Sequence, residues 1–271
     1  MDTRFWGPSG WRFLHQITFT YDPKHKRPIQ QLFSNLPFVL PCKFCRAHLT
    51  QHMKEEPLEP ALESKELLTK WLYAIHNLVN AKLRSQGIPT QDNPTFSSVR
   101  TFYEENLSYG CSQTYFPGWE FLFSIAETHP LSKESKVSSP LPNSPPRSPG
   151  MTYEELNEYN LLTPQERYEH YTAFWNSIGE CLPFLEWRTL WSRLEKKHAM
   201  KNSLKQRGTL IRSLWKVRCE METQFELQNT TQFGDLCRVL SYHRSNCGSS
   251  KKSVTCRRKL RAIKRAKTLK V

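Results

Sequence analysis

The sequence lacks any apolar run close to the roughly 18 residues that a membrane-spanning helix needs, and its mean hydropathy is −0.65. Its first residues, MDTRFWGPSGW, show neither the apolar core of a signal peptide nor the arginine- and serine-rich composition of a transit peptide. Cysteine is sparse, with eight in 271 residues, which is too few for a small domain held together by disulfides. We therefore expect a soluble, cytoplasmic protein with no membrane partner.

Acidic residues are also in short supply. The chain has 25 Asp and Glu against 39 Lys and Arg, a net charge of 39 − 25 = +14. Eleven of the basic residues and no acid lie in residues 244–271, which leaves 28 − 25 = +3 for the rest of the chain. Such a basic block is typically disordered and binds anionic surfaces. The tail is therefore a candidate contact for a nucleic acid or another acidic partner.

One segment lacks the composition needed for a core. Residues 129–150 hold six Pro and six Ser in 22 positions, a composition that favours extended, solvated chain, and we interpret them as a linker. Apolar residues recur at helical spacing on both sides. The sequence therefore predicts an all-α protein with a first domain at 1–128, the linker at 129–150, a second helical domain at 151–243 and the basic tail at 244–271.

The clearest helix signal lies in the first domain. Ser64 is a good N-cap before a run of apolar residues at helical spacing, and Gly87 just before Pro89 is a stop signal. These signals predict a helix between Ser64 and Gly87. A shorter helix is predicted from Ser98 to Leu107.

Two capping boxes mark helix starts after the linker: Thr152 with Glu155, and Thr163 with Glu166. Large apolar side chains at helical spacing in this region are typical of a core rather than of a binding platform. We therefore expect the following tryptophans and cysteines to be buried: Trp175, Trp187, Trp191, Trp215, Cys181 and Cys219.

The residues PCKFCR at 41–46 contain a CxxC pair, Cys42 and Cys45. A proline that suits a helix start places the first sulfur near the free N–H groups of the helix, where the helix dipole and adjacent basic side chains favour a thiolate. This arrangement is typical of a dithiol that exchanges disulfides. The pattern therefore predicts a redox-active pair.

Structural zinc is the alternative use of these cysteines. His48 and His52 lie three and seven residues after Cys45 and could complete a site. The four ligands would lack the roughly 12-residue spacer of ordinary zinc fingers, so the spacing favours the redox pair, and we predict no metal there. A second possible zinc set lies towards the C-terminus: Cys237, His243, Cys247 and Cys256.

Two other segments place polar rings and amides on apolar helices. Trp11 and His15 share one helical face in WGPSGWRFLH, and His76 and Asn80 share another in HNLVN, with Asn77 beside them. Several such groups in five positions of a buried helix would cost several kcal/mol without partners. We therefore expect a polar ligand against these helices.

With these motifs in this order, the chain closely resembles the Erv/ALR sulfhydryl oxidase family, whose hallmarks are WxxxxWxxxH, PCxxC and HNxVN. The resemblance spans residues 6–80 in its motifs and leaves the linker, the second helical domain and the tail unexplained. It implies a bundle of four helices plus a short fifth that holds FAD, commonly in a homodimer.

The resemblance also implies the chemistry. A substrate dithiol attacks the Cys42–Cys45 disulfide at Cys42, and Cys45, the sulfur nearer the flavin, leaves as a thiolate. Electrons then pass to FAD and to O₂, so that protein thiols are oxidised to disulfides and H₂O₂ is formed.

For the cofactor, the resemblance places Trp11 and His15 against the flavin, and His76 and Asn77 against the adenine and ribose. Flat side chains suit stacking on a planar cofactor, and cationic donors suit its pyrophosphate. The full set of cofactor-binding residues implied in this way is Trp6, Gly7, Trp11, His15, His76, Asn77, Val79, Asn80 and Lys82.

The chain departs from the family pattern at two points. Leu72 and Tyr73 stand where a structural disulfide usually begins, so we expect that bridge to be absent. A shuttle dithiol on a flexible segment is also not obvious. Cys247 and Cys256 in the tail are its best candidates, and Cys111 is another.

Short family members with an added C-terminal domain resemble those of large cytoplasmic DNA viruses, where the enzyme would form disulfides in the host cytoplasm and the virion. A zinc-stabilised nucleic-acid-binding protein, using the Cys and His sets and the basic tail, is the alternative. A thioredoxin-like exchanger is disfavoured, because no βαβ pattern surrounds the CxxC pair.

Overall fold

The computed structural model describes residues 1–88, 90–133, 138–225 and 232–244 of the chain. Within these ranges the secondary structure consists of helices and turns, with no strand. The all-α prediction is confirmed. None of the helices in the described ranges is long and apolar enough to cross a membrane.

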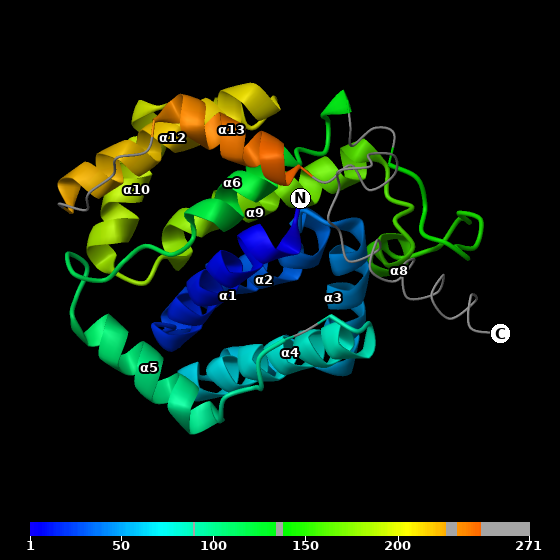
Figure 1. The fold of residues 1–271 in the computed structure, drawn as a ribbon, viewed down its shortest axis with the longest axis horizontal. Coiled ribbons are helices and arrows are strands. Elements are labelled where there is room, and N and C mark those ends of the chain that lie inside the picture. The colour runs from blue at the N-terminus through cyan, green and yellow to red at the C-terminus, as the bar shows by residue number, and fades with distance from the viewer. Residues whose placement is uncertain (89, 134–137, 226–231, 245–271) are drawn as a thin grey trace, which may run out of the picture.

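The first half of the chain forms a group of helices at the lower side of the view in Figure 1. Helix α4 packs against both α1 and α3, α2 packs against α3, and α5 packs against α1. The bounds are α1 (Thr3–Phe19), α2 (Lys26–Val39), α3 (Lys43–Glu55), α4 (Lys65–Ser85) and α5 (Phe96–Ser108), with short 3₁₀ helices at Pro23–His25 and Glu59–Glu63.

Helix α4 begins and ends where the sequence signals predict. The Ser64 hydroxyl accepts a hydrogen bond from the Leu67 backbone N–H at 3.1 Å, which satisfies one of the free donors of the first turn. After the last turn, Gly87 has a φ of 70°, a left-handed conformation that glycine adopts without strain. Both helix predictions in the first half of the chain, α4 and α5, are confirmed.

The helices from α6 onwards form a second group, which covers the other side of α1 and α2. Both predicted capping boxes are present, at Thr152 before α8 and at Thr163 before α9. The bounds are α6 (Trp119–Glu127), α8 (Tyr153–Glu158), α9 (Pro164–Cys181), α10 (Leu185–Lys197), α11 (Met200–Ser203), α12 (Arg207–Gln224) and α13 (Phe233–His243).

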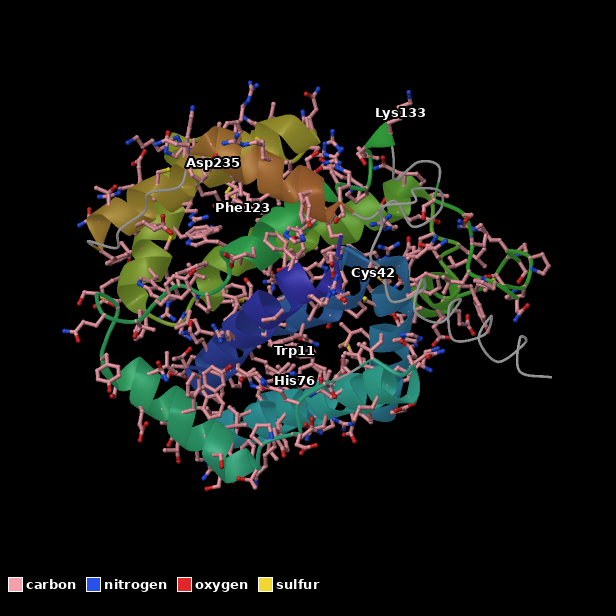
Figure 2. The ribbon with its side chains drawn as sticks, viewed as in Figure 1. Trp11, Cys42, His76, Phe123, Lys133 and Asp235 are labelled. Carbon is pink, nitrogen blue, oxygen red and sulfur yellow. The ribbon has the colours of Figure 1, made fainter. Side chains whose placement is uncertain are left out.

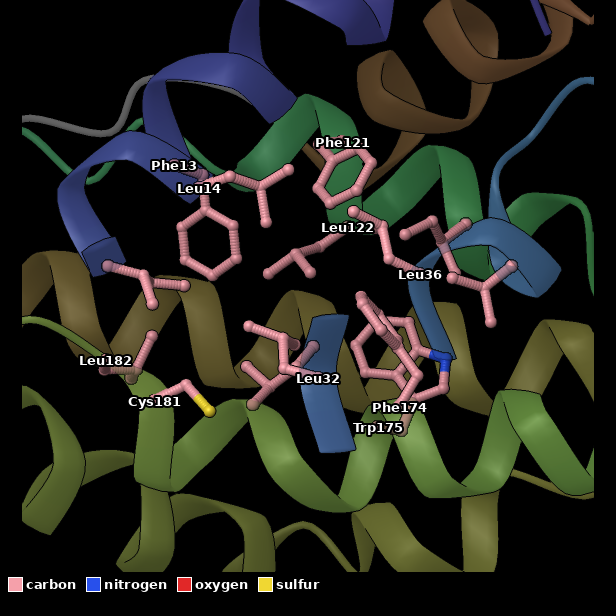
Figure 3. Packing of buried hydrophobic residues seen from close by; sticks show 14 of the residues in the cluster. Phe13, Leu14, Leu32, Leu36, Phe121, Leu122, Phe174, Trp175, Cys181 and Leu182 are labelled. Atoms are coloured by element: carbon pink, nitrogen blue, oxygen red, sulfur yellow. The ribbon is translucent and has the colours of Figure 1, made fainter. Parts of the chain in front are cut away.

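The two groups of helices, α1 to α5 and α6 to α13, share one hydrophobic core. The contact between α2 and α9 is the most extensive between any two helices, and α6 packs between α1 and α12. Figure 3 shows Leu32 and Leu36 of α2 facing Phe174 and Trp175 of α9, within a single buried cluster that runs from Met1 to Leu240. The sequence alone predicts two domains, and that division stays a prediction, but the two sets of helices stabilise each other directly.

Most of the side chains expected in the core are buried. Trp175, Trp187, Trp191 and Cys181 have 3% or less of their surface exposed, as predicted. Trp215 is only partly buried; its outer face carries the Arg218 guanidinium, 5.7 Å from the ring centroid. Cys219 is also only partly buried. Trp215 and Cys219 are therefore less buried than predicted, because the outer face of α12 is solvated.

Part of the predicted linker packs on the helices. Residues 138–150 form turns, and the Leu141 N–H donates to the Tyr159 carbonyl at 3.0 Å. Arg147 forms an ion pair of 2.5 Å with Glu166 in the first turn of α9. This segment is therefore non-helical, as its proline content predicts, but it is attached to α8 and α9.

Candidate active site

A cavity of about 840 Å³ lies among α1, α3, α4 and α5. Its size falls within the range of about 300–1,000 Å³ that is usual for ligand pockets. In Figure 2 the labelled Trp11 and His76 face one another between α1 and α4. All nine predicted cofactor-binding residues line this cavity: Trp6, Gly7, Trp11, His15, His76, Asn77, Val79, Asn80 and Lys82.

Flat side chains from three helices meet at one wall of the cavity. The rings of Trp11 and His76 are stacked, with centroids 3.9 Å apart and planes 9° apart. Nε2 of His15 lies 3.3 Å from Nδ1 of His76, and the ring of Tyr103 from α5 stacks on His15 at 5.2 Å. Because the i and i+4 positions of α1 share a face, Trp11 and His15 reach the same point of α4.

Burial keeps both imidazoles neutral. The side chain of His15 is 3% exposed; burial, with a smaller effect of His76, lowers its pKa to about 3. Burial also lowers the pKa of His76 to about 4. One neutral ring donates the shared hydrogen bond and the other accepts it. The remaining ring nitrogen of His15, Nδ1, is buried without a hydrogen-bond partner, as is the indole N–H of Trp6.

The Cys42–Cys45 pair stands at the start of α3, with Cys42 as its N-cap residue. Cys45 lines the cavity, whereas Cys42 lies outside its lining. Of the two cysteines, only Cys45 therefore borders the cavity that the aromatic side chains also line.

The surroundings of Cys42 favour its thiolate. A hydrogen bond from Cys45 has the largest effect, and burial opposes it. The backbone N–H of Cys45, the chain's N-terminal ammonium group and Arg46 act in the same direction as the first hydrogen bond, and together they lower the pKa of Cys42 to about 6. The lowered pKa favours the thiolate of Cys42, which is the reactive form in disulfide exchange.

Polar side chains also line the cavity. Asn77, Asn80 and Lys82 do so from α4, and the amide of Asn80 donates to Oδ1 of Asn93 at 2.8 Å. Burial and, after it, the positive charge of Lys82 lower the pKa of His48 to about 4. The lining therefore combines amide groups, a neutral imidazole and a lysine cation, which suits an anionic and hydrogen-bonding ligand.

Tyr103 and His48 are polar lining residues that the sequence did not assign to this site. Tyr103 is 8% exposed, and burial raises the pKa of its hydroxyl; its helix was predicted, but nothing in the sequence pairs it with His15. His48 was considered only as a zinc ligand, although its spacing of three residues from Cys45 places both on one face of α3.

Zinc was the alternative use of two sets of Cys and His side chains. Among the described residues, no three His, Cys, Asp or Glu side chains come together as a metal-binding group. Cys45, His48 and His52 instead line the cavity. In the second set, the His243 ring stacks on Phe5 at 4.3 Å, whereas Cys247 and Cys256 lie outside the described residues.

Three other cysteines were predicted as candidates for the shuttle dithiol: Cys247, Cys256 and Cys111. Cys247 and Cys256, its best candidates, cannot be placed because they lie outside the described residues. Cys111 lies in the turn before α6, where its carbonyl accepts from the Trp187 indole N–H at 3.1 Å, and burial raises the pKa of its thiol. A raised pKa makes this thiol a poorer nucleophile than Cys42 at neutral pH.

Comparison with known proteins matches residues 8–100 to the Erv1 / Alr family. An FAD-linked sulfhydryl oxidase of African swine fever virus is 32% identical over 106 residues, which are 38% of this chain and 82% of that protein. A protein of Acanthamoeba polyphaga mimivirus is 35% identical over 85 residues, 30% of this chain and 59% of its own length. The mitochondrial FAD-linked sulfhydryl oxidase of Saccharomyces cerevisiae is 30% identical over 82 residues, 29% of this chain and 42% of its own length. No solved structure matches the chain significantly.

Proposed function

The chain belongs to the Erv1 / Alr family, and on this premise we propose that it is an FAD-linked sulfhydryl oxidase that forms disulfide bonds in thiol-containing proteins. One observation on the residues of this chain supports the proposed activity. Cys45 of the CxxC pair lines the same cavity as the Trp11, His15 and His76 rings. A dithiol next to a cavity walled by flat side chains is the arrangement that thiol-to-flavin electron transfer requires.

The cavity fits FAD chemically. The stacked rings suit a planar ring system, and Lys82 and the amides of α4 in the same lining suit a ribose and pyrophosphate. Nδ1 of His15 and the Trp6 indole nitrogen, both buried without partners, would cost free energy if nothing polar reached them. When bound, FAD supplies the two-electron acceptor that passes electrons from the dithiol to O₂ and yields H₂O₂.

The exchange steps use the two cysteines in sequence. In the oxidised enzyme, a substrate thiolate attacks Sγ of Cys42; a bond forms between these two sulfurs, and the Cys42–Cys45 bond breaks. Cys45 takes the electron pair and becomes a thiolate at the cavity wall. The second substrate thiolate then attacks the mixed disulfide, which releases the substrate disulfide and leaves Cys42 as a thiolate. Cys45 is itself a thiolate at this point and donates no hydrogen bond from its sulfur, so the groups that stabilise the Cys42 leaving group are the Cys45 backbone N–H, the N-terminal ammonium group and Arg46.

We further propose that Cys247, with Cys256, is the shuttle pair of this enzyme. The last described helix ends beside the redox centre: the His243 carbonyl accepts from the Asp2 N–H at 2.9 Å, and the Met1 ammonium lies 3.5 Å from the Pro41 carbonyl oxygen. The end of α13 lies near the N-terminus in Figure 1. Four residues can span about 13 Å when extended, so the chain from His243 to Cys247 is long enough to reach towards Cys42.

The proposal extends to the partners and the setting of the enzyme. The viral sources of several relatives support a role in disulfide formation in the host cytoplasm and the virion, and the family resemblance supports a homodimer. The basic tail, with eleven Lys and Arg and no acid in residues 244–271, supports contact with a nucleic acid or another acidic partner.

The activity is tested with the purified full-length chain. We expect a yellow protein with a flavin absorption band that consumes O₂ and produces H₂O₂ with dithiothreitol. Cys42→Ser and Cys45→Ser should abolish turnover and keep the flavin, whereas Cys237→Ser, which changes an exposed thiol away from the cavity lining, is the matched control. A colourless preparation, or full activity in either CxxC variant, would contradict the proposal.

The shuttle needs a separate measurement. Cys247→Ala should slow oxidation of a reduced protein substrate and leave oxidation of dithiothreitol unchanged, because a small dithiol reaches Cys42 unaided. Unchanged turnover of the protein substrate in Cys247→Ala would remove this residue from the electron route.

A further inference from the structure

Arg46 links the redox helix to the loop that carries Cys42. This arginine follows Cys45 in the first turn of α3 and is 4% exposed. Its Nη1 donates a hydrogen bond to the Leu40 carbonyl at 3.0 Å, two residues before Cys42. The charge of Arg46 contributes to the thiolate-favouring environment of Cys42. The position of this guanidinium therefore affects both the geometry of the loop and the charge near its sulfur.

The other side of the guanidinium is held from far along the chain. Nη2 of Arg46 donates to Oδ1 of Asn160 at 2.7 Å. The Asn160 amide nitrogen in turn donates to the Ser139 carbonyl at 2.8 Å and lies 3.1 Å from the Ser138 hydroxyl. Because a backbone carbonyl can only accept, the amide nitrogen must face Ser139, and the amide oxygen is left to face Arg46.

The backbone at this position is also unusual. Asn160 has a φ of 55°, in the left-handed region that Asn adopts more readily than most residues, and it is 8% exposed. The preceding helix α8 is attached to α3 by a hydrogen bond from Asn157 to the Thr50 hydroxyl at 2.9 Å and by an ion pair between Lys54 and Glu158 at 2.6 Å. Asn160 is therefore held in place independently of Arg46.

The Asn160 amide that binds Arg46 carries no net charge, so it does not neutralise the positive charge of the guanidinium. A carboxylate at position 160 would pair with the guanidinium and cancel much of its field, whereas an amide orients the guanidinium and leaves its charge in place. The same segment also receives Lys43, whose ammonium group donates to the Ser139 carbonyl at 2.8 Å. Residues 138–160 thus contact Lys43 within the CxxC motif and Arg46 directly after it.

We propose that Asn160 is a positioning residue of the Cys42–Cys45 pair: it fixes the Arg46 guanidinium against the Cys42 loop, so that residues outside the family match form part of the redox centre. This inference rests on the proposed function for its biological meaning. In physical terms, the proposal is that Asn160 raises the reduction potential of the Cys42–Cys45 pair by holding the Arg46 cation near Cys42. A thiolate stabilised by a nearby cation stabilises the reduced form and raises the potential.

The test measures the equilibrium between Cys42–Cys45 and glutathione by thiol trapping under anaerobic conditions in the full-length protein. Asn160→Gly removes the side chain without straining the left-handed backbone, and Asn160→Asp adds a negative charge. Both should shift the equilibrium towards the disulfide by about three- to tenfold, where tenfold corresponds to about 30 mV. If one of the two variants does not fold, the potential of the other variant still tests the proposal.

The matched control is Asn106→Ala, which removes an asparagine side chain whose hydrogen bond, to the Phe102 carbonyl at 2.6 Å, stays within α5. It should leave the potential unchanged. In an Arg46→Gln background, Asn160→Gly should shift the potential no further, because its effect acts through the guanidinium. An unchanged potential in both Asn160 variants would overturn the assignment. The measurement uses neither flavin nor O₂, so an enzyme that consumed no oxygen would refute the proposed function without affecting this result.

Discussion

Nε2 of His15 lies 3.3 Å from Nδ1 of His76, and this hydrogen bond joins α1 to α4 at the wall of the cavity. Both rings are neutral because burial lowers the pKa of each. A neutral pair can donate and accept at the same time, so it links the two helices and still offers a ring nitrogen of His15 to a ligand. Predictions about the cofactor, acid stability and reactivity follow from this arrangement and its neighbours.

Stacking at Trp11 should contribute to cofactor binding. Trp11→Ala removes the ring that stacks at 3.9 Å on His76, and an aromatic pair contributes about 0.5–1.5 kcal/mol beyond buried area. We expect FAD affinity to fall by about two- to tenfold, measured by flavin fluorescence during titration of the apoprotein. Trp11→Phe, which keeps a flat ring, should retain most of the affinity. Equal affinity in Trp11→Ala would show that this wall does not contact the cofactor.

Acid should destabilise the fold through its buried histidines. His15, His76 and His48 have pKa values lowered to about 3, 4 and 4 in the folded state, against about 6.5 when unfolded. Between these values the unfolded chain binds more protons, so stability is full above about pH 6.5 and falls as the pH drops towards 4.

Each histidine that stays neutral contributes a slope of about 1.4 kcal/mol per pH unit. Urea unfolding at several pH values should therefore show a shallower slope for His15→Gln than for the unmodified chain. His25→Gln is the control, since His25 lies outside the cavity lining. Identical slopes for all three proteins would mean that His15 is protonated in the fold.

Cys42 should react as a thiolate at neutral pH. With its pKa near 6, its alkylation by iodoacetamide in the reduced protein should reach half its maximum rate close to pH 6, as read by mass spectrometry. Cys181 is 3% exposed, and burial raises its pKa, so it should stay unmodified. Cys45→Ala should move the Cys42 midpoint upwards, because Cys45 gives the largest favourable hydrogen bond. A midpoint that did not move would contradict this cause.

The shared core should make the two halves unfold together. Phe174 of α9 is completely buried in the cluster that includes α2, and Phe174→Ala is expected to destabilise the protein by about 3–5 kcal/mol. Leu185→Ala, at a side chain 66% exposed, should change stability by no more than about 0.5 kcal/mol. Differential scanning calorimetry should show one transition that shifts as a whole. Two transitions, of which only one shifts, would show independent domains.

Much of the site could be predicted from short motifs. Trp11 and His15 are four residues apart on one helix, and so are His76 and Asn80, so helical periodicity alone places each pair on one face. The CxxC spacing and the proline before it likewise predict the helix start that holds Cys42. Caps and stop signals located α4, because they depend on hydrogen bonds within a few residues.

Other features have no local signal. Tyr103 joins His15 only because α5 packs on α1, and Asn160 meets Arg46 across 114 positions of sequence. Neither residue stands out in the sequence, since each lies in an ordinary helix or turn. Such contacts are decided by how amphipathic faces pack, which many sequences of the same pattern could do differently.

The sequence by itself determined the helical class, the helix start at the CxxC pair and the two helices that bear histidine, because these depend on composition and on spacing within a turn or two of helix. Only the tertiary structure decided that α9 packs on α2 and that residues 138–160 reach the CxxC motif. These outcomes depend on the free energy of burying whole faces against one another. That free energy belongs to the assembled fold and not to any single segment.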